Sequence, residues 1–276
     1  MSGIYNMKKL DVQEKSRGVV LFAFNSTINY VQIAEKCARL VEYYLKLPVT
    51  LITDSADQIT YKFDHVILAE NTVDNYKSAF NSILWRNANR YQAYELSPYN
   101  ETLLIDSDYL ILNNSILKLF NQTFDYQIMQ YNQTLSENWN LDMGNTSLPY
   151  LWATVIMFNK TLKSKQLFDL VGRIQRNYNY YIKLFNIRER NFRNDYAFTM
   201  ANLILNGYDT NTESNIPWTM LTLENDIKSL ELKNNFIVVR EQETAYMLPK
   251  QNIHILNKEY LLSDNFTQFV NHICQE

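Results

Sequence analysis

A chain of 276 residues with 46% hydrophobic side chains can bury a sizeable core, and five glycines and five prolines leave little room for linkers. The net charge of −3 excludes a general attraction for nucleic acids or acidic membranes, so a polyanionic partner would need a local basic patch. The N-terminus lacks a signal-peptide core, no run reaches the roughly 18 apolar residues of a membrane helix, and the two cysteines have no metal or redox spacing. We therefore expect one domain over residues 1–276, with no membrane partner, in the cytoplasm.

The first part of the chain alternates short apolar runs with helical patterns. Buried strands are predicted at residues 18–24, 49–53, 65–69 and 102–105, and helices at residues 28–45 and 76–89. This alternation is typical of an α/β fold with a mainly parallel sheet and helices on both faces. Ligands of such sheets lie at the carboxyl ends of the strands, so Asn25, Asp54 and Asp106 should converge on one cleft.

The second half of the chain is less regular. Strands are predicted at residues 126–130, 153–158, 236–239 and 252–256, and helices at residues 162–185 and 195–206. The second of these helices is followed by Gly207, which suits a C-terminal cap. No internal repeat is visible.

Two acids follow the apolar strand 102–105 in the run LLIDSDYLI. Asp106 and Asp108 lie two residues apart where the chain leaves the sheet, so their carboxylates repel each other. A divalent cation such as Mg²⁺ or Mn²⁺ relieves that repulsion, because it prefers carboxylate oxygens and can bind diphosphate oxygens as well. The alternative is a solvated turn that happens to contain two acids.

The run LLIDSDYLI resembles the Asp-x-Asp motif of GT-A glycosyltransferases, which follows an apolar strand roughly a hundred residues into the chain. The resemblance implies a Rossmann-like GT-A fold, a nucleotide-sugar donor with UDP-sugars favoured, and Mn²⁺ or Mg²⁺. It makes Asp108 the principal metal ligand, Asp106 a ligand of the metal or the ribose, and Ser107 part of the donor site. It also implies a nucleotide-sugar-binding half at residues 18–110 and an acceptor half at residues 111–276.

The run HILNK near the C-terminus is similar to a His and Lys pair in glycogenin-like, family 8 members of this superfamily. The resemblance makes His254 a third metal ligand and Lys258 a ligand of the donor diphosphate. The run lacks the glycine of that pattern and has a shorter His to Lys spacing. A histidine at a strand end with a surface lysine is the alternative.

Further donor contacts are implied by the resemblance. Phe24, Asn25, Tyr30 and Asp54, at the ends of the first two strands, would cradle the nucleoside, although helix capping and turn chemistry explain Asn25 and Asp54 equally well. A basic residue ahead of the acids would steady the diphosphate or the sugar. Arg86 and Arg90 are equal candidates, with a surface salt bridge as the alternative.

Two positions in the second half resemble acceptor-side residues of GT-A enzymes. Trp152 could stack on a sugar or a base, or belong to the core. Asp195 looks like the acidic position that faces the transferred sugar, where it would take a proton from the acceptor in an inverting reaction or hold sugar hydroxyls in a retaining one. Capping of the helix that follows is the alternative role for Asp195.

A basic, aromatic stretch spans residues 173–193. Helical phase places Arg176 and Lys183 on one exposed face, and Arg193 ends the stretch just before Asp195. Such a face can guide a phosphate backbone to the site, although a solvated helix face is the simpler interpretation. Cytosolic glycosyltransferases of bacterial viruses that modify hydroxymethylated pyrimidines in DNA are similar in build. DNA is therefore the favoured acceptor, in the cytoplasm of a bacterium or of a virus-infected host.

Other classes remain open. The acceptor can instead be a protein, a lipid or a glycan, and the stretch 173–193 can belong to a nucleic-acid-binding module without catalysis. A haloacid-dehalogenase-type phosphatase also uses Asp-x-Asp, but Leu110 stands where that pattern needs Thr or Val. A sugar-nucleotide pyrophosphorylase would need a Gly-rich phosphate loop after the first strand, and none is present.

Overall fold

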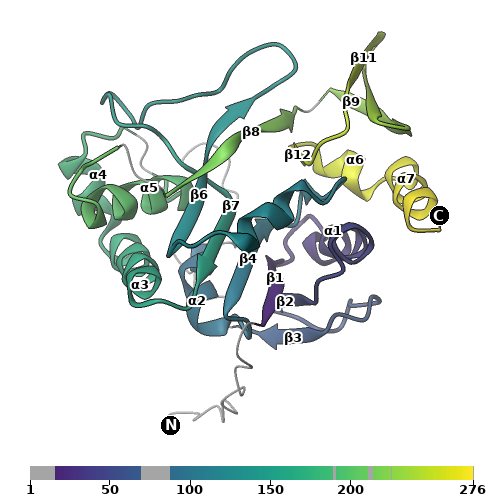
Figure 1. Cartoon of the computed structure of the whole chain (residues 1–276). Helices are drawn as coiled ribbons and strands as arrows, with labels where there is room; N and C mark the ends of the chain where they lie inside the picture. Colours follow the sequence, from purple (N-terminus) through teal and green to yellow (C-terminus); the bar gives the residue numbers. More distant parts are fainter. Residues whose placement is uncertain (1–15, 70–87, 189–190, 211–213, 225, 276) are drawn as a thin grey trace.

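A nine-stranded sheet crosses the protein in the order β3-β2-β1-β4-β7-β6-β8-β12-β5, and a three-stranded sheet, β11-β10-β9, lies beside one end of it (Figure 1). The computed structural model describes residues 16–69, 88–188, 191–210, 214–224 and 226–275. The strands of the large sheet are β1 (Arg17–Phe22), β2 (Val49–Thr53), β3 (His65–Leu68), β4 (Glu101–Asp106), β5 (Tyr109–Leu110), β6 (Tyr126–Gln133), β7 (Trp152–Asn159), β8 (Asn215–Leu223) and β12 (Ile253–Ile255). Those of the small sheet are β9 (Ile227–Lys233), β10 (Phe236–Glu241) and β11 (Thr244–Pro249).

Helices connect and cover these strands. The α-helices are α1 (Tyr30–Leu45), α2 (Ala93–Leu96), α3 (Leu162–Arg176), α4 (Tyr178–Leu184), α5 (Asn194–Leu205), α6 (Lys258–Leu262) and α7 (Asp264–Gln275), and two 3₁₀ helices are η1 (Ala88–Gln92) and η2 (Ser115–Asn121). Among the described residues, no helix combines the length and the apolar character needed to cross a membrane. Cys37 and Cys274 are both free thiols.

The large sheet is mainly parallel, as the alternation of strands and helices predicts. β3, β2, β1 and β4 run side by side in one direction, and the register pairs Phe22 of β1 with Ile52 of β2 and with Asp106 of β4. β7 is antiparallel to β4 and to β6, while β8 and β12 return to the common direction. The carboxyl ends of β2, β1 and β4 therefore meet at one edge, which brings Asp106 close to the loops that follow β1 and β2.

Two apolar layers hold the sheet between helices. On one face, α1 buries the side chains of Val31, Ala34, Ala38 and Val41 against β1, β2 and β4. On the other face, α3 and α5 pack against β4 and β7, on the opposite side of the sheet from α1 (Figure 1). The predicted α/β architecture is thus confirmed, with both faces covered.

The predicted helix 162–185 is wrong as a single element. The chain leaves the helical region at Asn177, where φ is −121° and ψ is 30°, and the side chain of Asn177 donates to the carbonyl of Arg173 at 2.9 Å. An asparagine side chain that bonds to nearby backbone competes with the helical pattern. The result is two helices, α3 and α4, with Arg176 and Lys183 exposed as predicted.

Other elements differ from the predictions mainly in the second half. The strands β5, β8, β9 and β11 and the C-terminal helices α6 and α7 were not anticipated. The predicted helix 76–89 falls, up to residue 87, outside the described residues. Gly207 follows α5 with a φ of 63°, and Tyr208 N–H donates to the carbonyl of Leu203 at 2.7 Å, so the predicted C-terminal cap is present.

Candidate metal and donor site

The two acids lie at the junction of β4 and β5. Asp106 is the last residue of β4, and Ser107 and Asp108 form the turn that leads into β5. Strand β12 pairs antiparallel with β5, which sets His254 opposite Tyr109. The backbone N–H of Ile255 also donates to the carbonyl of Asp108 at 3.0 Å. This strand pairing brings a histidine from the end of the chain beside acids from its middle.

Asp106, Asp108 and His254 form a group that can hold a cation. One ligand atom from each lies within 4.8 Å of the others. Ligands of an octahedral Mg²⁺ ion lie about 2.1 Å from it, so two of them are at most about 4.2 Å apart and small side-chain movements suffice. Asp108 Oδ1 is buried and has no hydrogen-bond partner among the described residues; His254 Nε2 lies 3.5 Å from it. Two carboxylates, one of them with an unsatisfied buried oxygen, and one imidazole fit Mn²⁺ or Mg²⁺.

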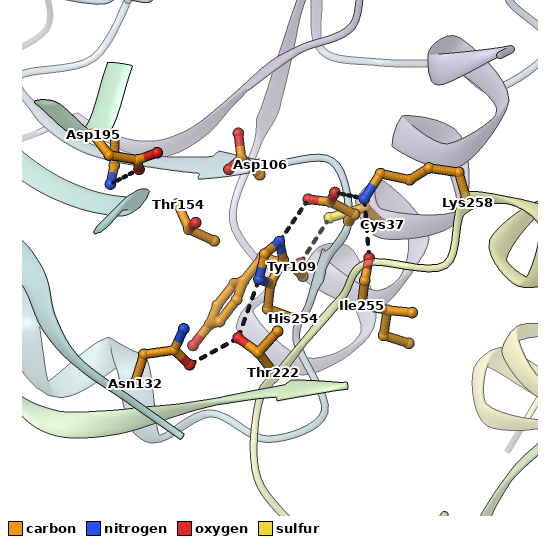
Figure 2. A network of polar contacts seen from close by, with 12 residues as sticks. Cys37, Asp106, Tyr109, Asn132, Thr154, Asp195, Thr222, His254, Ile255 and Lys258 are labelled. Carbon is orange, nitrogen blue, oxygen red and sulfur yellow. Dashed lines mark hydrogen bonds and ion pairs between the residues drawn. The ribbon is translucent and has the colours of Figure 1, made fainter. Parts of the chain in front are cut away.

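Lys258 completes this group from the first residue of α6. Its ammonium forms an ion pair with Oδ2 of Asp108 and donates to the carbonyl of Ile255 at 3.1 Å (Figure 2). Burial by itself would raise the pKa of Asp108, but nearby positive charge, chiefly that of Lys258, outweighs it and holds that pKa far below the usual range. Burial opposes the charge on Lys258 too, yet Asp108 raises its pKa. Both partners are therefore charged at neutral pH.

Asp106 has a different partner. The guanidinium of Arg90, which is only 2% exposed, forms an ion pair with Oδ1 of Asp106 and donates to the carbonyl of Thr154 at 3.5 Å. Burial raises the pKa of Asp106 more strongly than Arg90 lowers it, and the charge of Asp108 raises it further. Of the two arginines predicted for the donor site, Arg90 thus contacts an acid of the site, while Arg86 lies outside the described residues.

Asp195 lies at the start of α5, near Asp106 and Thr154 (Figure 2). Its Oδ1 accepts the backbone N–H of Ala153 at 2.9 Å, and its Oδ2 pairs with Arg193 at 3.3 Å. These contacts tie α5 to the beginning of β7. The negative charge of Asp195 also contributes to the raised pKa of Asp106, which is consistent with the two carboxylates facing a common space.

The residues predicted to hold the nucleoside surround the ends of β1 and β2. Phe24 is buried in the core, and the side chain of Asn25 accepts the N–H of Val31 at 3.0 Å and donates to Gln58 at 2.9 Å. Tyr30 is half-buried at the start of α1. Burial raises its pKa, the charge of Lys258 opposes that shift, and the charge of Asp108 adds to it. Asp54 follows β2 directly.

The predicted acceptor residues fall in two places. Trp152 is mostly buried at the start of β7 and stacks on Trp139, with ring centroids 6.2 Å apart and an interplanar angle of 16°. Arg176 and Lys183 lie on the exposed faces of α3 and α4. Arg193 is paired with Asp195 instead of extending that basic face.

Two residues that the sequence analysis did not consider lie behind His254. Its Nδ1 is 3.3 Å from Oγ1 of Thr222, which in turn donates to Oδ1 of Asn132 at 2.8 Å (Figure 2). Thr222 is next to His254 because β8 and β12 pair in parallel with these residues in register. The run TMLTL in β8, in which two threonines lie among apolar residues, was the only available signal, and it indicates a strand but no partner.

Comparison with known proteins gives a mixed result. No protein-family model matches the sequence, and no curated protein sequence matches it either. The solved structures that resemble the chain include the glycosyltransferase GlyE of Streptococcus pneumoniae TIGR4, at 13% identity and a TM-score of 0.40, over 73% of this chain. The match spans only 45% of GlyE.

Two further structures cover more of their own length. The galactosyltransferase LgtC, solved with donor and acceptor sugar analogs, matches at 11% identity and a TM-score of 0.45, over 75% of each chain. Mouse xyloside xylosyltransferase 1 matches at 11% identity and a TM-score of 0.43, over 70% of this chain and 83% of its own. All three are glycosyltransferases by name. At such low similarity, we base the functional conclusion on the site itself.

Proposed function

We propose that this protein is a metal-dependent glycosyltransferase that moves a hexosyl or pentosyl group from a nucleotide diphosphate sugar to a hydroxyl acceptor. The observation that carries the proposal is the convergence of Asp106, Asp108 and His254 at the carboxyl edge of the sheet, with Lys258 beside them. Two acids, an imidazole and an ammonium match a diphosphate held through a divalent cation. UDP-sugars are the favoured donors.

The cation, held by Asp106, Asp108 and His254, would offset the negative charge that develops on the diphosphate when the bond to the sugar breaks. The ammonium of Lys258 would also offset part of this negative charge. Two of its three N–H donors contact Asp108 and Ile255, and the third can reach a diphosphate oxygen. Arg90 forms an ion pair with Oδ1 of Asp106, which would leave Oδ2 for the metal or the donor.

The remaining donor contacts follow from the order of the strands. Residues 18–110 form the nucleotide-sugar-binding half in this proposal, with Phe24, Asn25, Tyr30 and Asp54 around the nucleoside and Ser107 at the diphosphate. This assignment is supported by the neighbouring carboxyl ends of β1, β2 and β4. Residues 111–276 form the acceptor half, in which Trp152 would contact the acceptor.

Asp195 is the proposed catalytic residue. Its carboxylate lies near Asp106 and is held by the backbone N–H of Ala153, so it has a fixed orientation. From there it would accept the proton of an acceptor hydroxyl if the reaction inverts the anomeric centre, or hold the sugar hydroxyls if it retains it. No covalent intermediate with the protein is needed in the inverting case.

A donor screen tests the proposal. The full chain is incubated with UDP- and GDP-sugars, with Mn²⁺ or EDTA, and release of nucleoside diphosphate is measured with and without a pool of acceptors. We expect Mn²⁺-dependent release that the substitution Asp108→Asn abolishes. A folded wild-type protein that consumes none of these donors would contradict the proposal.

DNA with hydroxymethylated pyrimidines is the proposed acceptor. Arg173, Arg176, Lys183 and Arg188 are all exposed, and within the described residues none of them forms an ion pair. The neighbouring side chain of Tyr180 is 64% exposed and can stack on an unpaired base. Proteins, lipids and glycans are the alternative acceptors, and mass spectrometry of the products distinguishes them.

A further inference from the structure

His254 is held from behind by a chain of two polar side chains. Its Nδ1 contacts Thr222 Oγ1 at 3.3 Å, and Thr222 Oγ1 donates to Asn132 Oδ1 at 2.8 Å (Figure 2). The residues come from three neighbouring strands, β12, β8 and β6, and all are buried, with exposed fractions of 7%, 1% and 0%. In a buried setting, each polar contact has a large effect on which hydrogen-bonding state is stable.

With Oδ1 of the Asn132 amide facing Thr222, the direction of these hydrogen bonds favours one tautomer of the imidazole. A hydroxyl has one proton, and Thr222 donates it to Asn132. Toward His254, the hydroxyl of Thr222 can therefore only accept, which requires the proton of a neutral imidazole to be on Nδ1. Nε2 then has a free lone pair, on the side that faces Asp108.

The contact on the other side of the ring agrees with this direction. Nε2 lies 3.5 Å from Oδ1 of Asp108, and in the described part of the chain that oxygen has no hydrogen-bond partner. A proton on Nε2 would favour a short bond to this buried carboxylate. With the imidazole proton on Nδ1, Nε2 and Oδ1 are two acceptors 3.5 Å apart, an arrangement that a cation between them stabilises.

We propose that Thr222 and Asn132 are positioning residues that keep His254 in its Nδ1–H tautomer, so that Nε2 is ready to bind the metal. This inference rests on the metal site of the proposed function. Hydrogen bonds of this kind to a metal-bound histidine fix both the ring orientation and the tautomer. The amide of Asn132 accepts the hydrogen bond of Thr222 without adding a third negative charge to a site that already has two.

Metal affinity tests this chain of hydrogen bonds from Asn132 through Thr222 to His254, called the relay below. Mn²⁺ binding to the full chain is measured from the loss of the electron paramagnetic resonance signal of free Mn²⁺. Thr222→Val keeps the shape of the side chain and removes the acceptor, so we expect about 10- to 100-fold weaker binding. Thr222→Ser restores the hydroxyl and should recover most of the affinity. Thr50→Val is the matched control, because Thr50 is also fully buried in the sheet and donates to Tyr99 instead.

Equal Mn²⁺ affinity of folded Thr222→Val and wild-type protein would overturn the relay, as would a loss that Thr222→Ser does not recover. A second substitution, Asn132→Leu, removes the acceptor of the Thr222 proton. Thr222 is then free to donate to Nδ1, which moves the imidazole proton to Nε2, so binding should weaken while the contact between Thr222 and His254 survives.

Nitrogen-15 NMR of histidine-labelled, metal-free protein reads the tautomer directly. The spectrum of His254→Gln identifies the signals of His254 among the three histidines. We expect an Nδ1–H tautomer in the wild type and an Nε2–H tautomer in Thr222→Val; an Nε2–H or doubly protonated ring in the wild type would overturn the relay. A wild-type protein that binds no Mn²⁺ would overturn the metal site instead, while the NMR result would still decide the relay.

Discussion

Lys258 and Asp108 form an ion pair in which the lysine occupies only one of the two carboxylate oxygens. Oδ2 contacts the ammonium, and Oδ1 faces His254 Nε2 at 3.5 Å without a hydrogen bond. The pairing keeps Asp108 ionised although it is buried, because the charge of Lys258 is the largest effect that opposes the cost of desolvation. One carboxylate can therefore hold a cation through Oδ1 and orient Lys258 through Oδ2.

Lys258→Met separates these two roles. We expect UDP to bind about tenfold more weakly in the presence of Mn²⁺, which corresponds to about 1.4 kcal/mol, because an N–H donor to the diphosphate is lost. Mn²⁺ should still bind through the three ligand residues. Isothermal titration calorimetry measures both affinities. Unchanged UDP affinity in the variant would remove Lys258 from the donor site.

Arg90→Met should destabilise the protein strongly. The substitution removes the buried partner of Asp106, and loss of one member of a buried ion pair typically costs about 3–5 kcal/mol. Urea unfolding measures the change in the free energy of unfolding. Lys165→Met is the control, because Lys165 pairs with Asp169 on an exposed face of α3, and we expect no measurable change there. A similar result for both variants would show that the Arg90 pair contributes little.

Asp195→Asn should distinguish catalysis from a structural role. The amide oxygen of asparagine can still accept the N–H of Ala153, so the link between α5 and β7 should survive. We expect unchanged thermal stability and KM for the donor, with kcat reduced about 100-fold or more if Asp195 is the general base. Steady-state kinetics with the identified acceptor provides the measurement. A variant with normal kcat would assign Asp195 a purely structural role.

The basic face of α3 and α4 predicts salt-dependent binding of DNA. The double substitution Arg176→Glu and Lys183→Glu should weaken binding of hydroxymethylated DNA and flatten its dependence on salt. Donor hydrolysis without acceptor should stay the same, since neither residue lies among the ligands of the metal site. Fluorescence anisotropy at several salt concentrations tests this. DNA binding in wild-type and Asp108→Asn protein, with no transfer by either, would favour the non-catalytic nucleic-acid-binding module.

Tyr99 predicts a specific loss of stability in alkali. Burial raises the pKa of Tyr99 to about 12, from about 10 for an ordinary tyrosine. Because the pKa of Tyr99 is higher in the folded protein than in the unfolded chain, the protonated hydroxyl stabilises the fold. This contribution to the free energy of unfolding is complete below pH 10 and is lost as the pH rises from about 10 to 12. That loss amounts to about 2–3 kcal/mol.

Tyr99→Phe isolates this contribution from those of the other buried tyrosines. At pH 7 the variant should be about 1 kcal/mol less stable, because it lacks the hydrogen bond between Thr50 and the Tyr99 hydroxyl. The deficit should shrink as the pH rises above 10 in urea unfolding experiments. A deficit that does not change between pH 8 and pH 11 would show that Tyr99 titrates normally.

The local signals in the sequence predicted the first half of the sheet well. The apolar runs at β1, β2 and β4 and the helical periodicity of α1 identified these elements to within a few residues, because buried parallel strands and amphipathic helices have strong patterns. The position of Asp106 at the carboxyl edge of the sheet was predicted from the alternation of strands and helices. The convergence of the two acids with His254 and Lys258 was anticipated only through a family resemblance.

The rest of the site depends on contacts that leave no local pattern. Strand β5 has two residues, too few for any periodicity, yet its pairing with β12 is what brings His254 to Asp108. The same is true of Thr222, which reaches His254 through the register of β8 and β12. Likewise, nothing in the residues around Arg90 indicates that it pairs with Asp106.

Anomalous X-ray diffraction from a crystal grown with Mn²⁺ and UDP tests the central claim most directly. We predict one strong manganese peak in contact with Asp106, Asp108 and His254 Nε2, bridging to the diphosphate of UDP with Lys258 beside it. A peak that lies elsewhere, or UDP bound with no manganese at these three residues, would contradict the account.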